Sequence, residues 1–466
     1  MSALTTGLGL ILAGWATAQT LTILHSFAPN GLGSNSDGAG PYGSLILSDN
    51  TLYGTARTGG SSGYGTVFTV KTDGSGFANL HSFTASSNGT NSDGAWPLAG
   101  LILSGNTLYG TTEAGGSSGA GAVFALNTDG TGFTNLHSFT AINDGAYPRA
   151  ALILSGNTLY GTANRGGSSG KGTVFAINTD GPGFTNLHSF AGSGEFYPQG
   201  ALVLSDNILY GTTAYGGGFG TLFALKTNGT GFTNLHKFAG SDGAFLFAGL
   251  VLSGNTLYGT ATSGGNGYGT VFSLKTDGTG FKTLHMFSRL PLNSDINRDG
   301  TYPSCLTLSG DTLYATAYYG GSAGNGTVFS VKTDGSFFTT LYDFTTSRSP
   351  FPPINSNSVI PNAGLISSGN ILYGTTHDGG TWDTGTVFSF SLPSVNTPPH
   401  LEVIPSGVYV ILTWPTNAAG FTLQSTTNLI SSAVWTTVSP GPDVVNGQYV
   451  VTNPISGTQQ FYRLSQ

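Results

Sequence analysis

Short runs of apolar residues, broken by tight polar turns, recur along most of the chain. One copy has apolar or alternating runs at residues 101–103, 107–111, 122–126 and 133–139, with a glycine-rich loop at 114–121 between the middle two. Ser-Gly-Asn and Thr-Asp-Gly turns separate the others. Runs of β-branched and aromatic residues bounded by such turns are typical of β-hairpins, and no window has the apolar period of a helix. Each copy therefore predicts four antiparallel strands.

The same unit occurs seven times. The string Leu-His-Ser-Phe, or a near copy of it, begins at residues 24, 80, 136, 187, 235, 284 and 341. The string Leu-Tyr-Gly-Thr, or a near copy, has its tyrosines at Tyr53, Tyr109, Tyr160, Tyr210, Tyr258, Tyr314 and Tyr373. Four antiparallel strands in every ~50 residues are typical of a β-propeller blade.

The two ends of this array complement each other. Residues 21–27 match only the fourth strand of a unit, and the last unit stops after its third strand at 386–390. If the first segment completes the last unit, the ring closes and two sheet edges that would favour unwanted pairing disappear. The sequence therefore predicts an all-β fold: a seven-bladed β-propeller over residues 19–394, closed by its N-terminal strand.

The segments outside the array have their own signatures. Residues 1–18 hold a short apolar run that ends in Ala16-Thr17-Ala18, the form of a signal-peptide cleavage site, so we expect an exported protein, secreted or at the cell surface. The prolines within 395–399 predict a linker. Alternating Val, Thr and Trp over 400–466 predict a small C-terminal β-sandwich.

Charge and cysteine content narrow the class of partner. The net charge is −7, only 8% of residues are charged and no basic run exists, so we expect no nucleic-acid partner. No stretch beyond the signal is apolar for long enough to span a bilayer, so we expect no transmembrane segment in the mature chain. The one cysteine, Cys305, replaces small residues such as Gly100 and Ala151 of other copies, and we expect a structural role for it. The oligomeric state stays open.

The repeat core has a recognisable form. It is Leu-x-Leu-Ser-Gly-Asn-x-Leu-Tyr-Gly-Thr-x-x-x-Gly-Gly, followed by Gly-Thr-Val-Phe, and it closely resembles the Gloeo/Verruco (GloVer) tandem repeat of bacterial surface or exported proteins. The resemblance covers most of the chain. It implies a propeller-like fold and export, and it brings no established catalytic residues with it.

Histidines and aspartates recur with the repeat. Six histidines share one position, namely His25, His81, His137, His188, His236 and His285, and Tyr342 takes the seventh copy. Equivalent positions of a ring point outward from different blades, so they cannot meet at one zinc ion, whose ligands lie within ~2.3 Å. We expect each histidine to pair locally, and we expect no metal and no other cofactor. Aspartates at repeated turns and loops, such as Asp73 and Asp93, are expected to bond their own backbone.

A single site in a repeat protein must use residues that differ between copies. Such positions follow the Tyr-Gly-Thr strand and line the channel mouth, where Tyr42, Leu98, Arg149, Gln199, Phe247 and Asn362 vary. The connections 28–41, 84–97, 288–303 and 345–361 are about twice as long as the others, and a closed ring makes their four copies adjacent. Exposed aromatic residues beside a few polar groups suit sugar or peptide binding. The predicted ligand-binding residues are Arg57, Trp96, Glu113, Tyr302, Tyr318, Tyr319, His377, Asp378 and Trp382.

These features favour a non-catalytic module that binds a glycan or a protein through its loop-bearing face. A polysaccharide-active hydrolase or lyase is the alternative. A glycosidase needs two opposed carboxylates ~5–9.5 Å apart, and Glu113 with Asp378 or Asp383 is the only such pair that the blade assignment places on one face. A purely structural surface module is the third possibility.

Overall fold

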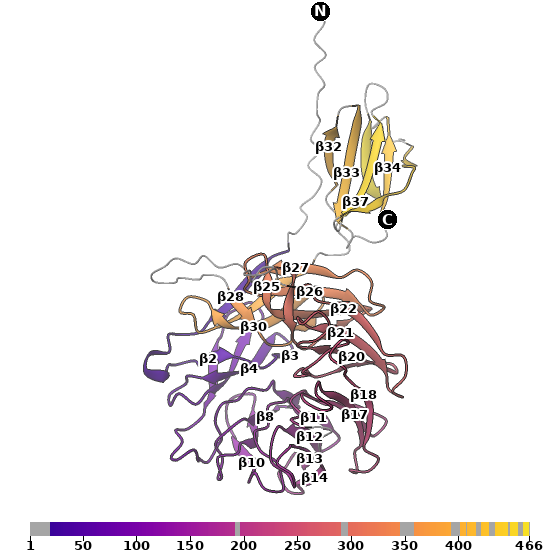
Figure 1. The fold of residues 1–466 in the computed structure, drawn as a ribbon. Helices are drawn as coiled ribbons and strands as arrows, with labels where there is room; N and C mark the ends of the chain where they lie inside the picture. Colours follow the sequence, from indigo (N-terminus) through magenta and orange to yellow (C-terminus); the bar gives the residue numbers. More distant parts are fainter. Residues whose placement is uncertain are drawn as a thin grey trace, which may run out of the picture. The chain divides into compact units, whose positions relative to one another are not determined.

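The computed structural model describes two compact units of almost pure β-structure (Figure 1). The larger unit is Leu21–Phe390, and the smaller unit includes Ser391–Gln466. The described residues are 19–191, 196–289, 297–344, 358–392, 401–406, 408–415, 421–427, 434–445, 448–454 and 460–465. The predicted signal segment, 1–18, and the predicted linker, 395–399, lie outside them. Within the described residues the one helical element is a 3-10 turn, η1 (Gly31–Gly33).

The larger unit consists of antiparallel sheets in chain order, which we number from 1 to 7. Sheet 1 contains β2 (Ala39–Pro41), β3 (Ile46–Ser48), β4 (Thr51–Thr58), β5 (Thr66–Lys71) and β6 (Ala78–Ser82). Sheet 2 contains β7 (Ile102–Ser104), β8 (Thr107–Thr112), β9 (Ala122–Asn127) and β10 (Thr134–Ser138). Sheet 3 contains β11 (Ile153–Ser155), β12 (Thr158–Ala163), β13 (Thr173–Asn178) and β14 (Thr185–Ser189). Sheet 4 contains β15 (Val203–Ser205), β16 (Ile208–Thr213), β17 (Thr221–Lys226) and β18 (Thr233–Lys237).

The remaining sheets repeat this order. Sheet 5 contains β19 (Val251–Ser253), β20 (Thr256–Ala261), β21 (Thr270–Lys275) and β22 (Lys282–Met286). Sheet 6 contains β23 (Asn297–Pro303), β24 (Thr307–Ser309), β25 (Thr312–Gly321), β26 (Thr327–Lys332) and β27 (Thr339–Asp343). Sheet 7 contains β28 (Ser358–Pro361), β29 (Ile366–Ser368), β30 (Ile371–Gly379), β31 (Thr386–Ser391) and, from the other end of the unit, β1 (Leu21–Ser26). Four- and five-stranded sheets of this kind are propeller-like blades.

The two segments that the sequence analysis paired lie in one sheet. β1 runs antiparallel to β31, with Ile23 opposite Phe388 and Ser26 opposite Thr386. Phe27, which is fully buried, packs in one cluster with Leu45 and Phe68 of sheet 1. The first strand of the unit therefore contributes both to sheet 7 and to the packing of sheet 7 against sheet 1.

The middle strands of each sheet are buried on both faces because neighbouring sheets pack face to face. In β9 the first five residues are buried, and one cluster joins Val67 and Phe83 of sheet 1 to Leu108 and Phe124 of sheet 2. Burying a side chain of this size contributes ~1.5–3 kcal/mol. The apolar surface of one sheet is thus covered only when the next sheet is present.

A repeated polar contact joins neighbouring sheets on the outer side in five places. His81 at the end of β6 stacks on Phe133 of sheet 2, with ring centroids 4.0 Å apart and planes 8° apart. Its Nε2 lies 3.1 Å from Oδ2 of Asp93, in the loop that leads into sheet 2. The amide of Thr84 donates to the same carboxylate at 3.0 Å. We call this arrangement the His–Asp clasp.

The clasp recurs around the unit. It joins His25 to Asp37, His137 to Asp144, His236 to Asp242 and His285 to Asp299, with Nε2–Oδ2 distances from 2.9 to 3.2 Å. His188 stacks on Phe232 in the same way. The histidines therefore pair locally, as predicted. The aspartates of these loops accept from their own backbone, as predicted, and also from the histidines, a contact that the sequence analysis did not anticipate.

The smaller unit has two antiparallel sheets with a shared core. One has the order β32 (Glu402–Ser406), β33 (Tyr409–Pro415), β37 (Gln448–Pro454) and β36 (Asp443–Val445), and the other β35 (Thr436–Thr437), β34 (Thr422–Thr426) and β38 (Phe461–Ser465). Leu412 and Trp414 are almost fully buried and pack with Leu423. Val403, Val408, Val434 and Val444 are at least half exposed.

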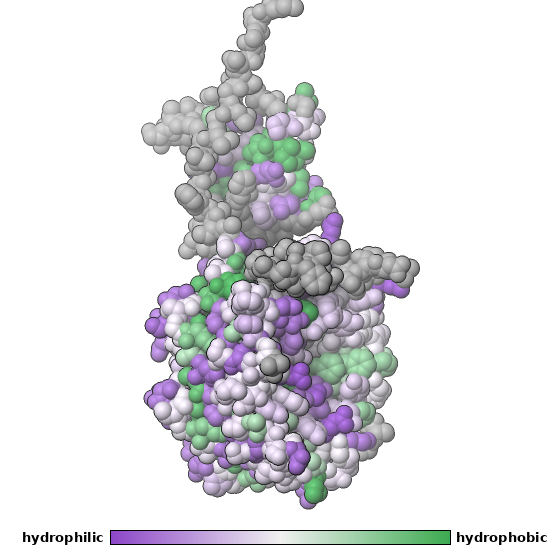
Figure 2. Space-filling model, turned by 90° about the vertical axis from the view of Figure 1, so that its left-hand side faces the viewer, coloured by the Kyte–Doolittle hydropathy of each residue, from purple (hydrophilic) through white to green (hydrophobic). Residues whose placement is uncertain are grey.

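The surface drawn in Figure 2 is mixed in polarity. Hydrophilic and apolar side chains alternate over the larger unit, and an apolar patch appears on the smaller one. Within the described residues, no helix is long and apolar enough to cross a membrane.

The clasp predicts a loss of stability in acid. Burial alone would raise the pKa of Asp93, but hydrogen bonds from His81 and Thr84 outweigh it and hold the pKa below its ordinary value of 3.8. Burial lowers the pKa of His137 below 6.5, although Asp144 opposes the shift. Both pKa values are lower in the folded chain, so the unfolded chain binds protons more readily at each group. The free energy of unfolding therefore falls as the pH drops below about 6.5, where the histidine titrates, and again below about 4, where the aspartate titrates.

Asp93→Asn tests this dependence. We expect it to lower the free energy of unfolding at pH 7 by about 1.5–3 kcal/mol, since a charged hydrogen bond between sheets is lost. It should also flatten the acid limb below pH 4 in urea titrations at several pH values. Asp180→Asn, in an exposed turn, is the control and should change neither quantity. An unaltered acid limb in Asp93→Asn would refute the role of the clasp carboxylate.

Candidate functional site

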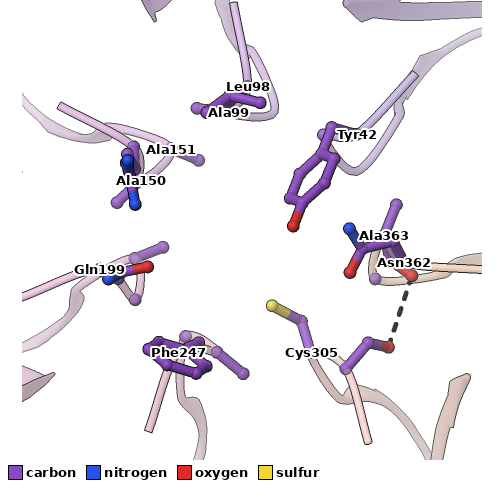
Figure 3. Close-up of a pocket in the computed structure, with 18 of the residues that line it drawn as sticks. Tyr42, Leu98, Ala99, Ala150, Ala151, Gln199, Phe247, Cys305, Asn362 and Ala363 are labelled. Carbon is purple, nitrogen blue, oxygen red and sulfur yellow. Dashed lines mark hydrogen bonds between the residues drawn. The ribbon is translucent and has the colours of Figure 1, made fainter. Parts of the chain in front are cut away.

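One cavity of about 830 Å³ lies where the inner segments of the larger unit meet. Every sheet contributes to its lining, through residues 42–44, 98–100, 149–151, 199–201, 247–249, 303–305 and 362–364. Figure 3 shows these segments around an open centre, with the Tyr42 hydroxyl and the Cys305 sulfur directed inward. All six of the channel-mouth positions predicted from the sequence, from Tyr42 to Asn362, line the cavity.

Small residues and a threonine keep the inner wall closely packed. The Oγ1 of Thr55 in β4 donates to the carbonyl of Ala99 in the next sheet at 2.9 Å, and Thr111 and Thr212 make equivalent bonds. A Cβ on Gly43 would lie 2.5 Å from the Ala99 carbonyl, so no larger residue fits there. The first residue of each segment varies most in size, and all of these residues line the cavity.

The long loops into sheets 1, 2 and 6 are fixed by an asparagine. Oδ1 of Asn35 accepts from the amides of Gly38 and Gly60, at 2.8 and 2.9 Å, and its Nδ2 donates to the Ala28 carbonyl. Asn91 and Asn297 make the same set of contacts in their loops. The glycine pair at 59–60 is therefore held by the loop beside it, and the described parts of these loops form an ordered wall.

One residue shortly before the cavity-lining segment of each sheet has a left-handed backbone. These residues are Gly40, Trp96, Tyr147, Tyr197, Phe245, Tyr302 and Ile360, with φ between 56° and 63°. The conformation is imposed by a hydrogen bond to the preceding sheet: the amide of Trp96 donates to the Tyr64 carbonyl at 2.9 Å, and that of Gly40 to Thr384 at 2.8 Å. Glycine adopts this backbone freely, whereas a bulky residue pays of order 1–3 kcal/mol.

Five of these seven strained positions hold an aromatic residue, and we call Trp96, Tyr147, Tyr197, Phe245 and Tyr302 the aromatic rim. Trp96 and Tyr147 are each 37% exposed, and Tyr197 and Tyr302 line the cavity. A bulky side chain that is kept where glycine would be less strained suggests a role for the side chain itself. Gly40 of sheet 1 has the same backbone conformation without a side chain, so this conformation does not itself require an aromatic residue.

Cationic side chains lie against this rim. The guanidinium of Arg57 is 5.9 Å from the Trp96 ring centroid, and that of Arg165 is 5.0 Å from the Tyr197 centroid. Arg149 donates through Nε to Oε1 of Glu113 at 2.8 Å and pairs with the same oxygen through Nη2. The mouth therefore combines flat apolar faces with charged donors.

The predicted site residues do not all lie in the same place. Arg57, Glu113, Tyr302, Tyr318 and Tyr319 line the cavity, and Trp96 adjoins Arg57. The His377 ring is 6.1 Å from that of Tyr42, and its Nδ1 is 2.6 Å from Oδ1 of Asp378. Trp382 is 57% exposed in the loop between β30 and β31.

Tyr318 lies among the groups of this sector. Burial raises its pKa to about 12, and the neighbouring Tyr319, Tyr42 and Asp378 act in the same direction. Its hydroxyl therefore stays protonated at any physiological pH and can donate a hydrogen bond.

The carboxylates of the catalytic alternative have other partners. Glu113 is 7% exposed and bonded to Arg149, and Oδ1 of Asp383 accepts from the Gly379 amide in its own turn at 2.8 Å. Asp378 is paired with His377. Burial raises the pKa of the Cys305 thiol, which opposes formation of a nucleophilic thiolate. Among the described residues, no three His, Cys, Asp or Glu side chains are grouped as metal ligands would be.

The predicted ligand-binding set left out the aromatic residues on the short-loop side, although Phe247 was among the variable channel-mouth positions. Tyr215 lies 5.8 Å from Tyr197 and 5.2 Å from Phe245, and it is stacked with Phe196 at 5.7 Å. Phe247 is also 38% exposed beside them. The sequence analysis placed the site beside the long connections, whereas these residues belong to sheets with short ones. The available signal was the aromatic residue before a proline, as in Trp96-Pro97, Tyr147-Pro148, Tyr197-Pro198 and Tyr302-Pro303.

Comparison with known proteins gives a family and a fold. The Gloeobacter/Verrucomicrobia repeat matches residues 3–220 and 218–404. No curated protein matches the sequence. The GH74 enzyme of Niastella koreensis is 13% identical over 92% of this chain and 71% of its own, with a TM-score of 0.51. An oligogalacturonate lyase in complex with manganese is 9% identical over 82% of this chain and 99% of its own, at 0.49. The likeness to the GH74 enzyme shows a shared fold alone.

The strained rim makes a prediction about stability. At a left-handed position the usual penalty of glycine is reversed, so Tyr147→Gly should be more stable than Tyr147→Ala by about 1 kcal/mol. Tyr318, on strand β25 and outside the set of positive-φ residues, is the matched control, and there the alanine variant should be the more stable. Chemical denaturation of the four variants measures both differences. The same sign at both positions would show that Tyr147 is not strained.

Proposed function

This chain belongs to the Gloeobacter/Verrucomicrobia repeat family, and we propose that its larger unit is a closed seven-bladed β-propeller that binds a glycan at the central cavity without transforming it. The aromatic rim is the observation that carries the proposal. Aromatic faces beside a few polar donors, around a cavity of about 830 Å³, match the composition of sites that take ligands of several rings.

Closure of the propeller rests on the ends of the unit. β1 completes sheet 7 from the other end of the chain, and Phe27 packs against sheet 1. The lining of one cavity by all seven sheets also supports a ring, because an open array would not return its last sheet to its first. The smaller unit is proposed as a separate β-sandwich module of residues 400–466, and residues 1–18 as an export signal.

The binding residues of this proposal come from both sides of the mouth. Tyr42, Tyr318, His377 and Asp378 form one polar sector, with Trp382 exposed beyond it. Tyr197, Tyr215 and Phe247 form an aromatic sector on the other side. Aromatic rings bury sugar faces with little loss of conformational entropy, while hydroxyl, imidazole and guanidinium groups fix orientation.

A polysaccharide-active hydrolase or lyase is the second candidate. The His377–Asp378 pair beside Tyr318 is the observation that favours it, because such a pair can move a proton. The engagement of Glu113 by Arg149, and of Asp383 by its own turn, favours binding without catalysis.

Substitutions in the polar sector test the proposed function. Binding of the intact chain is first sought on a glycan array and then measured by calorimetry. We expect Tyr318→Ala and Trp382→Ala each to weaken binding about 10-fold, since one well-packed aromatic contact contributes roughly 1–2 kcal/mol. Phe337→Ala is the matched control, because Phe337 is 53% exposed, much as Trp382 is, but lies in the turn between β26 and β27. Unchanged affinity in both test variants, or release of shortened or unsaturated sugars, would contradict the proposal.

A cross-link tests closure. Thr22 and Ser389 are opposite each other in β1 and β31, so cysteines at both positions should form a disulfide that links the two ends of the unit. The bond should raise the free energy of unfolding by about 2–4 kcal/mol. Thr22→Cys with Ser330→Cys, the equivalent position of β26 in sheet 6, is the control and should not cross-link. Mass spectrometry without reductant separates the outcomes, and failure of the first pair would argue against closure.

A further inference from the structure

We infer that the ligand of this cavity is an anionic polysaccharide, one whose sugar units carry carboxylate or sulfate groups that bind to Arg57 and to amides elsewhere in the lining. The inference rests on the proposed function and names its ligand class. It follows from the charge of the lining, from unpaired hydrogen-bond donors and from the position of the cations on aromatic faces.

The charge of the lining is opposite to that of the whole chain. The chain has 14 Lys and Arg against 21 Asp and Glu, a net charge of −7. Among the described residues that line the cavity there are three arginines, Arg57, Arg149 and Arg165, and one carboxylate, Glu113. Glu113 is bonded to Arg149, so its charge is compensated locally. The remaining two guanidinium groups attract anions to an otherwise acidic protein.

Three polar groups of the lining have no hydrogen-bond partner within the described part of the chain. They are Nε of Arg57, Nδ2 of Asn164 and Nδ2 of Asn362. All three are N–H donors. Asn164 is only 3% exposed, and a buried donor without an acceptor costs ~1–3 kcal/mol. Each of these three nitrogen atoms is itself buried, so a ligand reaches it only when the side chain turns toward the cavity. Carboxylate and sulfate oxygens are the strongest acceptors that a saccharide offers to such a donor.

Arg57 and Asn164 also occupy equivalent places in sheets 1 and 3. Each is the second residue after the Tyr-Gly-Thr string, at the cavity end of its strand. The donors thus come from different sheets, whereas a small anion would need them at one point. A chain with several charged groups can satisfy donors that are spread around the mouth.

The aromatic rim gives the second half of the recognition. Arg57 lies against Trp96 and Arg165 against Tyr197, so each cation adjoins a flat apolar face. A sugar ring with an acidic substituent presents the same two features, an apolar face of C–H groups and a charge at its edge. This pairing favours an acidic saccharide over an acidic peptide, which has no flat apolar ring beside each carboxylate.

A matched pair of oligosaccharides tests the inference. The hexamer of β-1,4-linked mannuronate and the hexamer of β-1,4-linked mannose differ only in the carboxylate at C6. Calorimetry on the intact chain at low salt should give at least 10-fold tighter binding for the mannuronate hexamer, and this preference should decrease as salt is added. A sulfated galactan oligomer and its desulfated form make the second arm, which distinguishes sulfate from carboxylate as the preferred anion.

Two variants locate the effect. Arg57→Met should weaken binding of the preferred anionic oligomer at least 10-fold and leave the neutral hexamer within about 2-fold. Asn164→Leu should weaken the same binding without lowering Tm, because it removes a buried amide that has no partner for its N–H. Lys226→Met, at the exposed end of β17, removes a cation away from the cavity and should leave every affinity unchanged.

The outcomes separate the two proposals. Equal affinity for charged and neutral oligomers, with losses in Tyr318→Ala, would overturn the anionic ligand and leave glycan binding standing. Unchanged anion binding in both Arg57→Met and Asn164→Leu would overturn the assigned site. Binding of a hexaglutamate peptide, with none of the four oligosaccharides bound, would overturn both the anionic polysaccharide and the glycan.

Discussion

The contact between one sheet and the next is the interaction on which the rest of the structure depends. A sheet whose middle strands are buried on both faces cannot be stable alone, because its apolar surface is covered only by its neighbours. The His–Asp clasp fixes the outer side of five of these contacts, as with His81, Phe133 and Asp93. The Thr55–Ala99 hydrogen bond fixes the inner side. Between these two sets of bonds, phenylalanine and leucine side chains provide most of the free energy.

These contacts between sheets determine which positions can hold different residues in different copies. Residues that hold sheets together repeat in most copies, because each copy faces a similar neighbour. The residue of each sheet that has the left-handed backbone is constrained in its backbone only. Its amide must reach the preceding sheet, and the left-handed conformation follows. Its side chain is free, so Gly40, Ile360 and five aromatic residues can share one backbone. A site with distinct chemistry on each side can therefore arise in an architecture built from near-identical units.

The sequence predicted the strands and their order because strand signals repeat in phase, and each copy supports the interpretation of the others. It placed β8 and β9 within one residue, since the Leu-Tyr-Gly-Thr and Gly-Thr-Val-Phe strings mark them. It did not join His81 to Asp93, because the spacing between the two partners varies from 6 residues in one copy to 14 in another. It could not predict the left-handed backbone of the rim either, because a positive φ at Trp96 or Tyr197 is set by a hydrogen bond to another sheet.

The rim is interrupted at sheets 7 and 1, which have Ile360 and Gly40 where the other five sheets have an aromatic residue. A Cβ on Gly40 would lie 3.1 Å from Nε2 of His377. The imidazole of sheet 7 therefore occupies the space beside Gly40, and it is bonded on its other side to Asp378. The polar His377–Asp378 pair thus replaces one aromatic face at the junction where the first and last sheets meet. A ligand that lies across aromatic rings elsewhere would meet hydrogen-bonding groups at this junction, so only one orientation along the mouth satisfies both.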